Sequence, residues 1–210
     1  MSSGDFVRLA PIHPDSLPDY QTWEAMLRKW NARINLVAPN SLPDFWQRHA
    51  LDSAQIIPFL PEGAQTIVDF GSGAGFPALA IAIDAKHRQL ERTVHLIESV
   101  GKKASFLKSV SRETGLPTQI HSDRIETLPS LQADIVTARA FAPLHRLLPM
   151  AWHHLKADGA LLLLKGEAVM TEIEDAAENW HFEHHLTPSL SQETGYVLEM
   201  RNLRPRECFT

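Results

Sequence analysis

The sequence predicts a doubly wound α/β fold preceded by a helical segment. From Gln65 onward, short apolar runs alternate with helix-like stretches, as expected for buried parallel strands connected by helical crossovers. These runs occupy residues 66–70, 93–97, 118–121, 133–138 and 159–164. Before residue 60, apolar residues instead recur every three or four positions, which is typical of helices. This change of period divides the chain into a helical extension, 1–62, and an α/β domain, 63–210.

Two helices are predicted in the extension. The apolar face of the first is formed by Tyr20, Trp23, Leu27, Trp30 and Ile34. A second helical stretch covers residues 45–59 and ends near Pro58 and Pro61, because proline cannot continue a helix. We expect the apolar face of the first helix to be core packing.

The C-terminal part predicts a helix followed by a hairpin. Residues 167–178 are acidic and helix-like, and two further apolar runs follow at 180–186 and 196–203. Because these runs are joined through Gly195, we expect an antiparallel hairpin at the edge of the sheet. The predicted sheet then has seven strands and is mostly parallel.

Composition and length limit the class of protein. The 210 residues, of which 44% are hydrophobic and 21% charged, are ordinary for a globular protein and argue against disorder, a collagen-like fibre and a coiled coil. The longest apolar run, residues 78–83, is far shorter than the ~20 residues of a membrane span. Residues 1–5 show no secretory signal, and the single cysteine, Cys208, cannot close an intrachain disulfide. We therefore expect a cytoplasmic protein.

A glycine-rich turn follows the first predicted strand. It reads Asp69-Phe70-Gly71-Ser72-Gly73-Ala74-Gly75-Phe76-Pro77. Glycines permit a tight turn and the close approach of a ligand to the backbone, and Pro77 suits the start of a helix with free N–H groups. A dinucleotide fingerprint would place its third glycine at residue 76, where this chain has phenylalanine. The spacing therefore disfavours a dehydrogenase that binds a pyrophosphate.

The second predicted strand ends at an acid, Glu98. Acids at about this distance from the glycine turn bind ribose hydroxyls in nucleotide-binding α/β folds. The alternative, an acid that only favours the N-terminus of the next helix, stays open. In the absence of a phosphate-binding fingerprint, Glu98 favours an adenosyl ligand without phosphates.

Polar residues also follow the third, fourth and fifth predicted strands. They are Ser122-Asp123-Arg124-Ile125-Glu126, Thr137-Ala138-Arg139-Ala140 and Lys165-Gly166. Singly, such residues are more often helix caps or members of surface ion pairs. Because ligands of open α/β sheets bind at the carboxyl ends of the strands, the residues together predict the edge of a pocket.

Six motifs make the chain resemble one family from about residue 20 to the C-terminal hairpin. They are Asn31-x-x-x-Asn35-Leu36, Arg48-His49-x-x-Asp52-Ser53, the Asp69 to Pro77 turn, Glu98-Ser99-x-x-Lys102-Lys103-x-x-Phe106-Leu107, Arg139-Ala140-x-Ala142 and Lys165-Gly166. The sequence resembles the bacterial small-subunit (16S) ribosomal RNA guanine-N7 methyltransferase family, also called glucose-inhibited division protein B. The resemblance implies a Rossmann-like class I S-adenosylmethionine (SAM)-dependent methyltransferase domain over residues 63–210. Ala78 follows Pro77 where many members have glycine, which should alter the start of the helix slightly and leave the cofactor unchanged.

The resemblance also implies roles for individual residues. Cofactor binding is expected at Asp69, Gly71, Gly73, Phe76, Glu98, Ile125, Glu126 and Arg139. Among these, Glu98 would bind the ribose, and Ile125 with Glu126 the adenine edge. Catalytic roles are expected for Arg139, Lys165 and His49, with Arg139 facing the junction of cofactor and target base. The product of the cofactor would be S-adenosylhomocysteine, and no metal is expected.

Chemistry narrows the acceptor, because methyl transfer from a sulfonium needs an atom that presents a lone pair. Guanine N7 already has one, so alignment and electrostatics suffice and no dedicated general base is required. The fourth strand is not followed by Asn-Pro-Pro-Tyr or Asp-Pro-Pro-Tyr, which would favour methylation of an adenine amino group. The position of Cys208 near the C-terminus argues against the cysteine attack that methylation of cytosine C5 needs. N7 survives this elimination, and so do small-molecule acceptors.

Basic residues near the expected pocket are candidates for RNA binding. They are Arg48, Lys102, Lys103, Lys108 and Arg112. On a helical wheel Lys108 and Arg112 fall opposite the apolar residues, whereas Lys103 falls toward the apolar side. The net charge of −5 works weakly against nonspecific binding to polyanions and does not exclude RNA. The resemblance implies 16S ribosomal RNA or the small ribosomal subunit as partner, with no membrane, and we expect a monomer.

Eleven histidines raise the question of a metal site, especially the pairs His153-His154 and His184-His185. Adjacent residues point about 100° apart on a helix and to opposite faces on a strand. Since no cysteine or carboxylate pattern with ligand spacing accompanies these pairs, the sequence predicts no metal site.

Two alternatives share the cofactor-binding fold and stay open. One is a methyltransferase that acts on a small metabolite. The other is a noncatalytic protein connected with cell division, which would retain the fold without transferring a methyl group. Salt dependence separates the first from an RNA enzyme, because binding to RNA weakens as salt rises.

Overall fold

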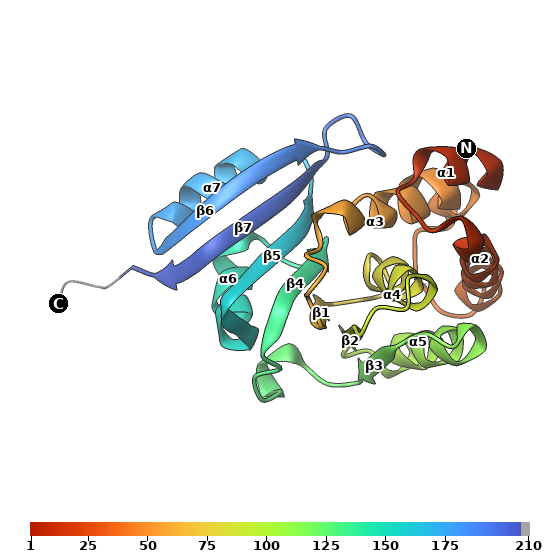
Figure 1. Ribbon diagram of the computed structural model, residues 1–210, viewed down its shortest axis with the longest axis horizontal. Coiled ribbons are helices and arrows are strands. Elements are labelled where there is room, and N and C mark those ends of the chain that lie inside the picture. Colours follow the sequence, from red (N-terminus) through yellow and green to blue (C-terminus); the bar gives the residue numbers. More distant parts are fainter. Residues whose placement is uncertain (207–210) are drawn as a thin grey trace.

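Seven strands form one mixed sheet in the computed structural model, which describes residues 1–206 (Figure 1). The strands are β1 (Thr66–Phe70), β2 (Thr93–Ile97), β3 (Thr118–His121), β4 (Ala133–Arg139), β5 (Leu155–Lys165), β6 (Trp180–Pro188) and β7 (Tyr196–Pro205). Their order is β3-β2-β1-β4-β5-β7-β6. Strands β1 to β5 are parallel, and β7 runs antiparallel to β5 and β6. The predicted α/β class and edge hairpin are confirmed.

The strand order reverses at β1, and this reversal creates the place for a ligand. The chain passes from β1 outward to β2 and β3, then returns to β4 on the other side of β1. The segments that follow β1 and β4 therefore leave the same edge of the sheet side by side. Open α/β sheets bind ligands at this switch point, beyond the carboxyl ends of the strands.

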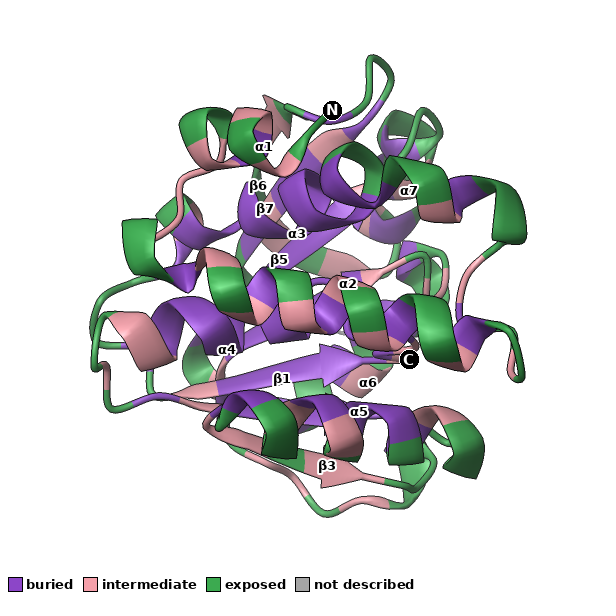
Figure 2. Ribbon diagram, turned by 90° about the vertical axis from the view of Figure 1, so that its right-hand side faces the viewer, coloured by how far each residue is buried: buried purple, intermediate pink, exposed green. Residues whose placement is uncertain are grey.

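Helices cover both faces of the sheet (Figures 1 and 2). The α-helices are α1 (Ser3–Leu9), α2 (Leu17–Asn31), α3 (Asp52–Ala54), α4 (Ala78–His87), α5 (Gly101–Thr114), α6 (Leu144–His154) and α7 (Val169–Ala177). Figure 1 places α2, α4 and α5 on one face and α6 with α7 on the other. The predicted acidic helix is confirmed as α7. Among residues 1–206, no helix combines the length and the apolar character needed to cross a membrane.

The predicted helical stretch over residues 45–59 is present but is not one regular α-helix. Short helical turns stand there instead: a π-helical segment, η3 (Phe45–Leu51), then α3, then a 3₁₀ turn, η4 (Ile57–Phe59). Pro58 lacks the N–H that would bond the carbonyl of Ala54, where the α-helical geometry ends. Two other 3₁₀ turns, η1 (Pro14–Ser16) and η2 (Pro39–Asp44), precede this region, and η5 (Ile125–Thr127) follows β3.

Two more boundaries differ from prediction. Helix α2 ends at Asn31, whose side-chain oxygen accepts hydrogen bonds from the N–H groups of Leu36 and Val37 at 2.9 Å, so Ile34 lies beyond the helix. Strand β5 begins at Leu155 rather than 159. The apolar pattern missed its first residues because Lys156 and Asp158 are polar, and the pairing with β4 shifts register there. Cys208 lies outside the described residues.

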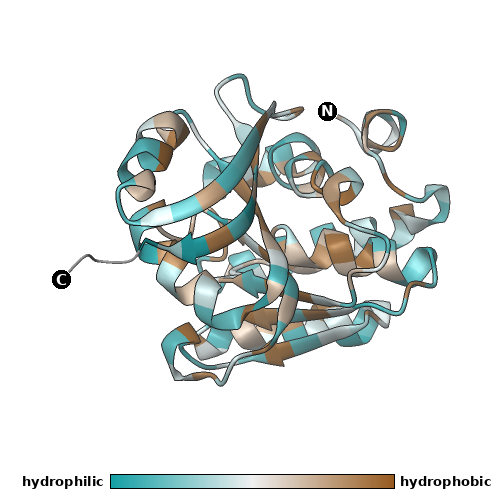
Figure 3. Ribbon diagram, turned by 60° about the vertical axis from the view of Figure 1, so that its left-hand side comes forward, coloured by the Kyte–Doolittle hydropathy of each residue, from teal (hydrophilic) through white to brown (hydrophobic). Residues whose placement is uncertain are grey.

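The helical extension shares a hydrophobic core with the sheet. Phe6, Tyr20, Trp23 and Phe45 belong to one cluster with residues of β1, β2, α4 and α5. The indole N–H of Trp23 donates to the carbonyl of Ala74 at 3.0 Å, which ties α2 to the glycine turn. A second cluster fills the other face beneath α6 and α7. The hairpin strands carry both hydrophilic and hydrophobic residues (Figure 3), and in β7 Val197, Leu198, Met200 and Leu203 are buried while Arg201, Asn202 and Arg204 are exposed.

Candidate functional site

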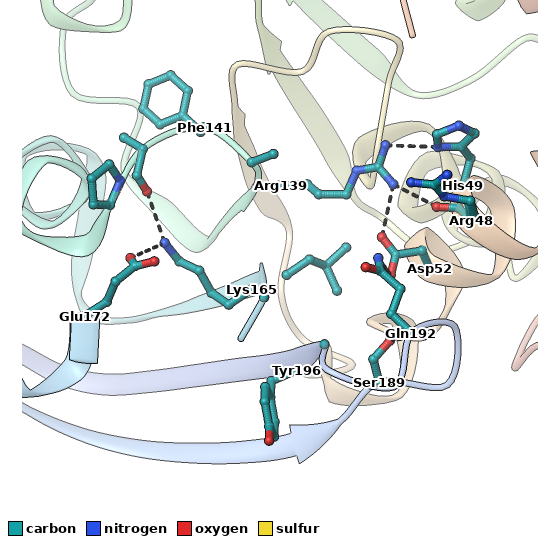
Figure 4. Close-up of a pocket in the computed structure, with 16 residues that line it drawn as sticks. Arg48, His49, Asp52, Arg139, Phe141, Lys165, Glu172, Ser189, Gln192 and Tyr196 are labelled. Atoms are coloured by element: carbon teal, nitrogen blue, oxygen red, sulfur yellow. Dashed lines mark hydrogen bonds and ion pairs between the residues drawn. The ribbon is translucent and has the colours of Figure 1, made fainter. Parts of the chain in front are cut away.

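Two cavities lie at the carboxyl edge of the sheet. The smaller has a volume of about 220 Å³ and is lined by Gly71, Glu98, the segment 123–126 and part of α6. The larger, about 580 Å³, is lined by η3, the ends of β4 and β5, and the β6–β7 loop (Figure 4). Phe141 and Ala142, in the loop after β4, line both. The predicted pocket edge is therefore confirmed as a place where residues from the ends of β1 to β5 meet.

Glu98 fastens the glycine turn to the start of α5. Its carboxylate accepts the N–H of Gly73 at 2.9 Å on one oxygen and the N–H of Val100 at 2.8 Å on the other. The side chain is buried yet lines the smaller cavity. Because each carboxylate oxygen has a second acceptor position, Glu98 retains the capacity to accept ligand hydroxyls. Ile125 and Glu126 line the same cavity, and their contact with adenine stays a prediction.

Asp69 lies beneath the turn and lines neither cavity. One carboxylate oxygen accepts the hydroxyl of Thr137 at 2.8 Å, and the other, fully buried, has no hydrogen-bond partner. Burial raises the pKa of Asp69 to about 7, since it penalises the charged form. The predicted cofactor role of Asp69 stays a prediction, and its unpaired oxygen marks an unused acceptor at the turn.

Phe76 is the centre of a stack under the larger cavity. The His49 ring lies parallel to it at 4.7 Å between centroids, and Trp23 lies at 4.8 Å. The guanidinium of Arg139 is 4.4 Å from the centroid of the Phe76 ring. This arrangement buries Phe76 and orients the polar residues that contact it.

Three groups hold the guanidinium of Arg139 in place (Figure 4). Of its two terminal nitrogens, Nη1 donates to a carboxylate oxygen of Asp52 at 3.0 Å and to the carbonyl of Arg48 at 3.1 Å. The other donates to Nδ1 of His49 at 3.2 Å. Arg139 therefore stands on the wall of the larger cavity in a fixed orientation, and its place at the junction of cofactor and target base stays a prediction.

The hydrogen bonds of His49 fix its tautomer. Because arginine can only donate, Nδ1 of His49 must accept, and the neutral ring carries its proton on Nε2. Nε2 then donates to the hydroxyl of Ser41 at 3.0 Å, which donates to the carbonyl of Ala38. Burial first, then the charges of Arg139 and Arg48, lower the pKa of His49 to about 4. Both ring nitrogens are thus engaged in the neutral state.

Asp52 joins the extension to the hairpin loop. While one oxygen accepts from Arg139, the other accepts from Gln55 at 3.0 Å, Ser191 at 2.5 Å and Gln192 at 3.3 Å. Ser191 and Gln192 lie between β6 and β7, more than a hundred residues away in sequence. The sequence analysis found Asp52 within a family motif but predicted no role for it. The fixed spacing Arg48-His49-x-x-Asp52 was the available signal.

Lys165 supports the loop after β4. Its ammonium donates to the carbonyl of Ala142 at 3.0 Å and to the carboxylate of Glu172 at 2.7 Å. The same carboxylate oxygen accepts the N–H of Leu144 at 2.9 Å, at the start of α6. Glu172, on α7, was not found by sequence reasoning, because nothing in the chain marks it apart from other acids of that helix.

The predicted RNA-binding residues lie on two elements. Arg48 is exposed and lines the larger cavity. On α5, Lys102, Lys108 and Arg112 are exposed, and Lys103 is partly buried, as the helical wheel indicated. Contact of any of them with RNA stays a prediction. Within residues 1–206, the structure places no group of three or more histidine, cysteine or acidic side chains that could hold a metal ion.

Comparison with known proteins assigns the chain to a family. A family model, GidB, described as rRNA small subunit methyltransferase G, matches residues 16–197, which is most of the chain. The chain belongs to this family. A relative from Rhodospirillum centenum, named ribosomal RNA small subunit methyltransferase G, is 42% identical over 202 residues, which cover 96% of this chain and 91% of the relative. The family resemblance found in the motifs is therefore confirmed.

Solved structures confirm the fold of this family member. A putative O-methyltransferase from Klebsiella pneumoniae superposes with a TM-score of 0.58 at 13% identity, over 88% of this chain and 90% of that chain. The TYW2 protein of M. jannaschii in complex with AdoMet gives a TM-score of 0.55 at 14% identity, over 83% and 80%. With the observed strand order and C-terminal hairpin, they identify a class I SAM-dependent methyltransferase fold.

Proposed function

We propose that this chain transfers the methyl group of SAM to N7 of a guanine in 16S ribosomal RNA. The observation that carries the proposal is the pair of adjoining cavities, one beside the glycine turn and Glu98, the other walled by the fixed guanidinium of Arg139. The relatives' name supports ribosomal RNA of the small subunit as the substrate class. The cytoplasm remains the expected location.

The residues of the smaller cavity fit SAM. Glu98 has acceptor positions for the ribose hydroxyls, and Ile125 with Glu126 would hold the adenine edge. The methionine portion would lie along the turn at Gly71 and Gly73, of which Gly71 lines the cavity. Phe76 and Asp69 are buried and line neither cavity, so they would support the turn from beneath. When bound, SAM supplies an electrophilic methyl group on a sulfonium.

Arg139 and Asp52 would set the electrostatics on the acceptor side. Guanine presents O6 beside N7 as an acceptor, so a guanidinium N–H group suits recognition of O6 while the N7 lone pair stays free to attack the methyl group. Positive charge grows on the base during methyl transfer, and the positive charge of an unpaired guanidinium would repel it and so slow the transfer. Asp52, 3.0 Å from Arg139, offsets that charge and keeps the group oriented.

No residue of this network is free to act as a general base. His49 uses Nδ1 to accept from Arg139 and Nε2 to donate, Asp52 accepts four hydrogen bonds, and Glu172 is paired with Lys165. This supports an acceptor atom that carries no proton, as N7 does. We therefore assign His49 and Lys165 to positioning, and Arg139 to contact with the target.

Mapping of the transferred methyl group tests the proposal. Labelled SAM is incubated with small subunits and naked 16S RNA that lack the modification, and with a metabolite extract. We expect label on N7 of one guanine, loss of transfer in Arg139→Ala and retention in Arg8→Ala, an exposed arginine of α1. Transfer should also fall steeply with added salt. Label on an amino group, or on a metabolite alone, would contradict the proposal.

A further inference from the structure

The ring of Phe141 covers the part of the glycine turn that a ligand would approach. A Cβ built on Gly71, whose φ is +64°, would lie 2.4 Å from Cδ2 of Phe141, so the ring rests directly on the glycine backbone. Phe141 also packs edge-on against Phe70, with 5.9 Å between ring centroids. The ring therefore separates the turn from the larger cavity.

The cavity beside Glu98 is small for a complete adenosyl donor. Its volume of about 220 Å³ lies below the roughly 300–1,000 Å³ typical of ligand sites, whereas the larger cavity reaches about 580 Å³. A donor and an acceptor must meet, so the two spaces have to be joined during the reaction. Of the described residues, Phe141 and Ala142 line both, and the phenylalanine has the bulky side chain.

The backbone around Phe141 is held while its ring is less restricted. Lys165 bonds the carbonyl of Ala142, and Glu172 bonds the N–H of Leu144. The side chain of Phe141 is itself only partly buried. Rotation about χ1 between staggered positions can therefore move the ring off Gly71 without moving the loop.

We propose that Phe141 is a positioning residue that makes binding ordered, cofactor before RNA. Without cofactor the ring rests on Gly71 and narrows the cavity on the donor side. With cofactor the ring turns into the larger cavity, where its face stacks on the target base. Aromatic faces are the usual surface on which proteins hold unstacked RNA bases. The inference has a donor half, that the ring hinders cofactor binding, and an acceptor half, that the ring stacks on the target base. The acceptor half rests on the proposed function, whereas the donor half rests only on cofactor binding.

The variant Phe141→Ala should have two opposite effects. Calorimetry should show tighter SAM binding. Because only proteins with the ring off Gly71 bind SAM well, the apparent affinity of the wild type is reduced to the populated fraction of that state, and a fraction of ~10% gives a gain of about tenfold in the variant. In the same variant, the KM for small subunits should rise roughly tenfold, since stacking on an aromatic ring contributes about 1–3 kcal/mol per base. Phe141→Tyr should retain the wild-type behaviour in both measurements.

A matched control variant shows whether the effects are specific to Phe141. Phe182→Ala removes a partly buried ring on β6, away from both cavities, and should change neither value. Cofactor binding by Phe141→Ala that is unchanged or weaker overturns the donor half, and an unchanged KM for small subunits overturns the acceptor half. If the wild type binds SAM but methylates no RNA, the proposed function and the acceptor half fail together, while calorimetry alone still decides the donor half.

Discussion

At the scale of single residues, hydrogen bonds within the protein fix the polar side chains that line the two cavities. The sequence predicted Arg139, His49 and Glu98 from their positions after strands and in motifs, and the structure places all three at the two cavities. It could not predict Asp52 as the partner of Arg139, because the contacts that Asp52 also makes with Ser191 and Gln192 cross most of the chain. Hydrogen bonds between distant segments leave no periodic signal in a sequence.

The protonation of His49 gives a pH prediction. Folding lowers its pKa from 6.5 to about 4, so the unfolded chain binds this proton more tightly than the native state. The stability contributed by His49 is therefore complete above pH 6.5 and is lost as the pH falls toward 4. Protonated Nδ1 would also face the donor of Arg139, and two donors cannot bond each other.

The measurement compares the wild type with His49→Asn. The difference in their free energies of unfolding, from urea titrations, should shrink by roughly 2 to 3 kcal/mol between pH 7.5 and pH 4.5. Other titrating groups, including Asp69, are present in both proteins and cancel in this difference. A difference that stays constant over this range would show that His49 does not titrate as its surroundings require.

At the scale of elements, the loop after β4 is fixed by contacts from β5 and α7. The alternation of apolar runs predicted the sheet and its hairpin well, since the central strands β1, β4 and β5 are buried enough to show in composition. The irregular helical geometry between Pro39 and Phe59 was not predicted, because Asp52 and Gln55 there form hydrogen bonds with the distant residues 189–192, which no local pattern reveals. One of the turns there, η3, carries Arg48 and His49, and π-helical turns are frequent at functional sites.

Removal of the Glu172 carboxylate should loosen the loop. In Glu172→Ala, the N–H of Leu144 and the largely buried ammonium of Lys165 lose their shared partner, which should cost about 1–3 kcal/mol of stability. Hydrogen exchange should become faster at residues 142–147. Glu174→Ala, an exposed acid on the same helix, is the control and should leave exchange unchanged. Equal exchange in the two variants would argue against a supporting role for Glu172.

The first helix should stabilise the site through Trp46. Phe6 is fully buried, with its ring 4.9 Å from Tyr20 and 5.3 Å from Trp46 of η3. Phe6→Ala should therefore lower the free energy of unfolding by about 3–5 kcal/mol, as truncation of buried aromatic residues does. Leu9→Ala, at a side chain that is 60% exposed, should change it by less than about 0.5 kcal/mol. Similar values for both would mean that α1 is not part of the core.

At the scale of the whole molecule, the extension and the sheet together enclose the acceptor side. The larger cavity takes its walls from η3, the ends of β4 and β5, and the hairpin loop, so none of these parts forms it alone (Figure 4). The donor side, by contrast, belongs to the sheet domain and follows from the strand order. That division explains why the sequence pattern found Glu98, Ile125 and Glu126 on the donor side but not the role of Asp52 on the acceptor side.

The most direct test is a crystal structure of the protein with S-adenosylhomocysteine bound. The account predicts ribose hydroxyls hydrogen-bonded to the carboxylate of Glu98, and the thioether sulfur facing the larger cavity beside Arg139. A ligand seated elsewhere, or one whose ribose leaves Glu98 bonded to Gly73 and Val100 alone, would contradict it.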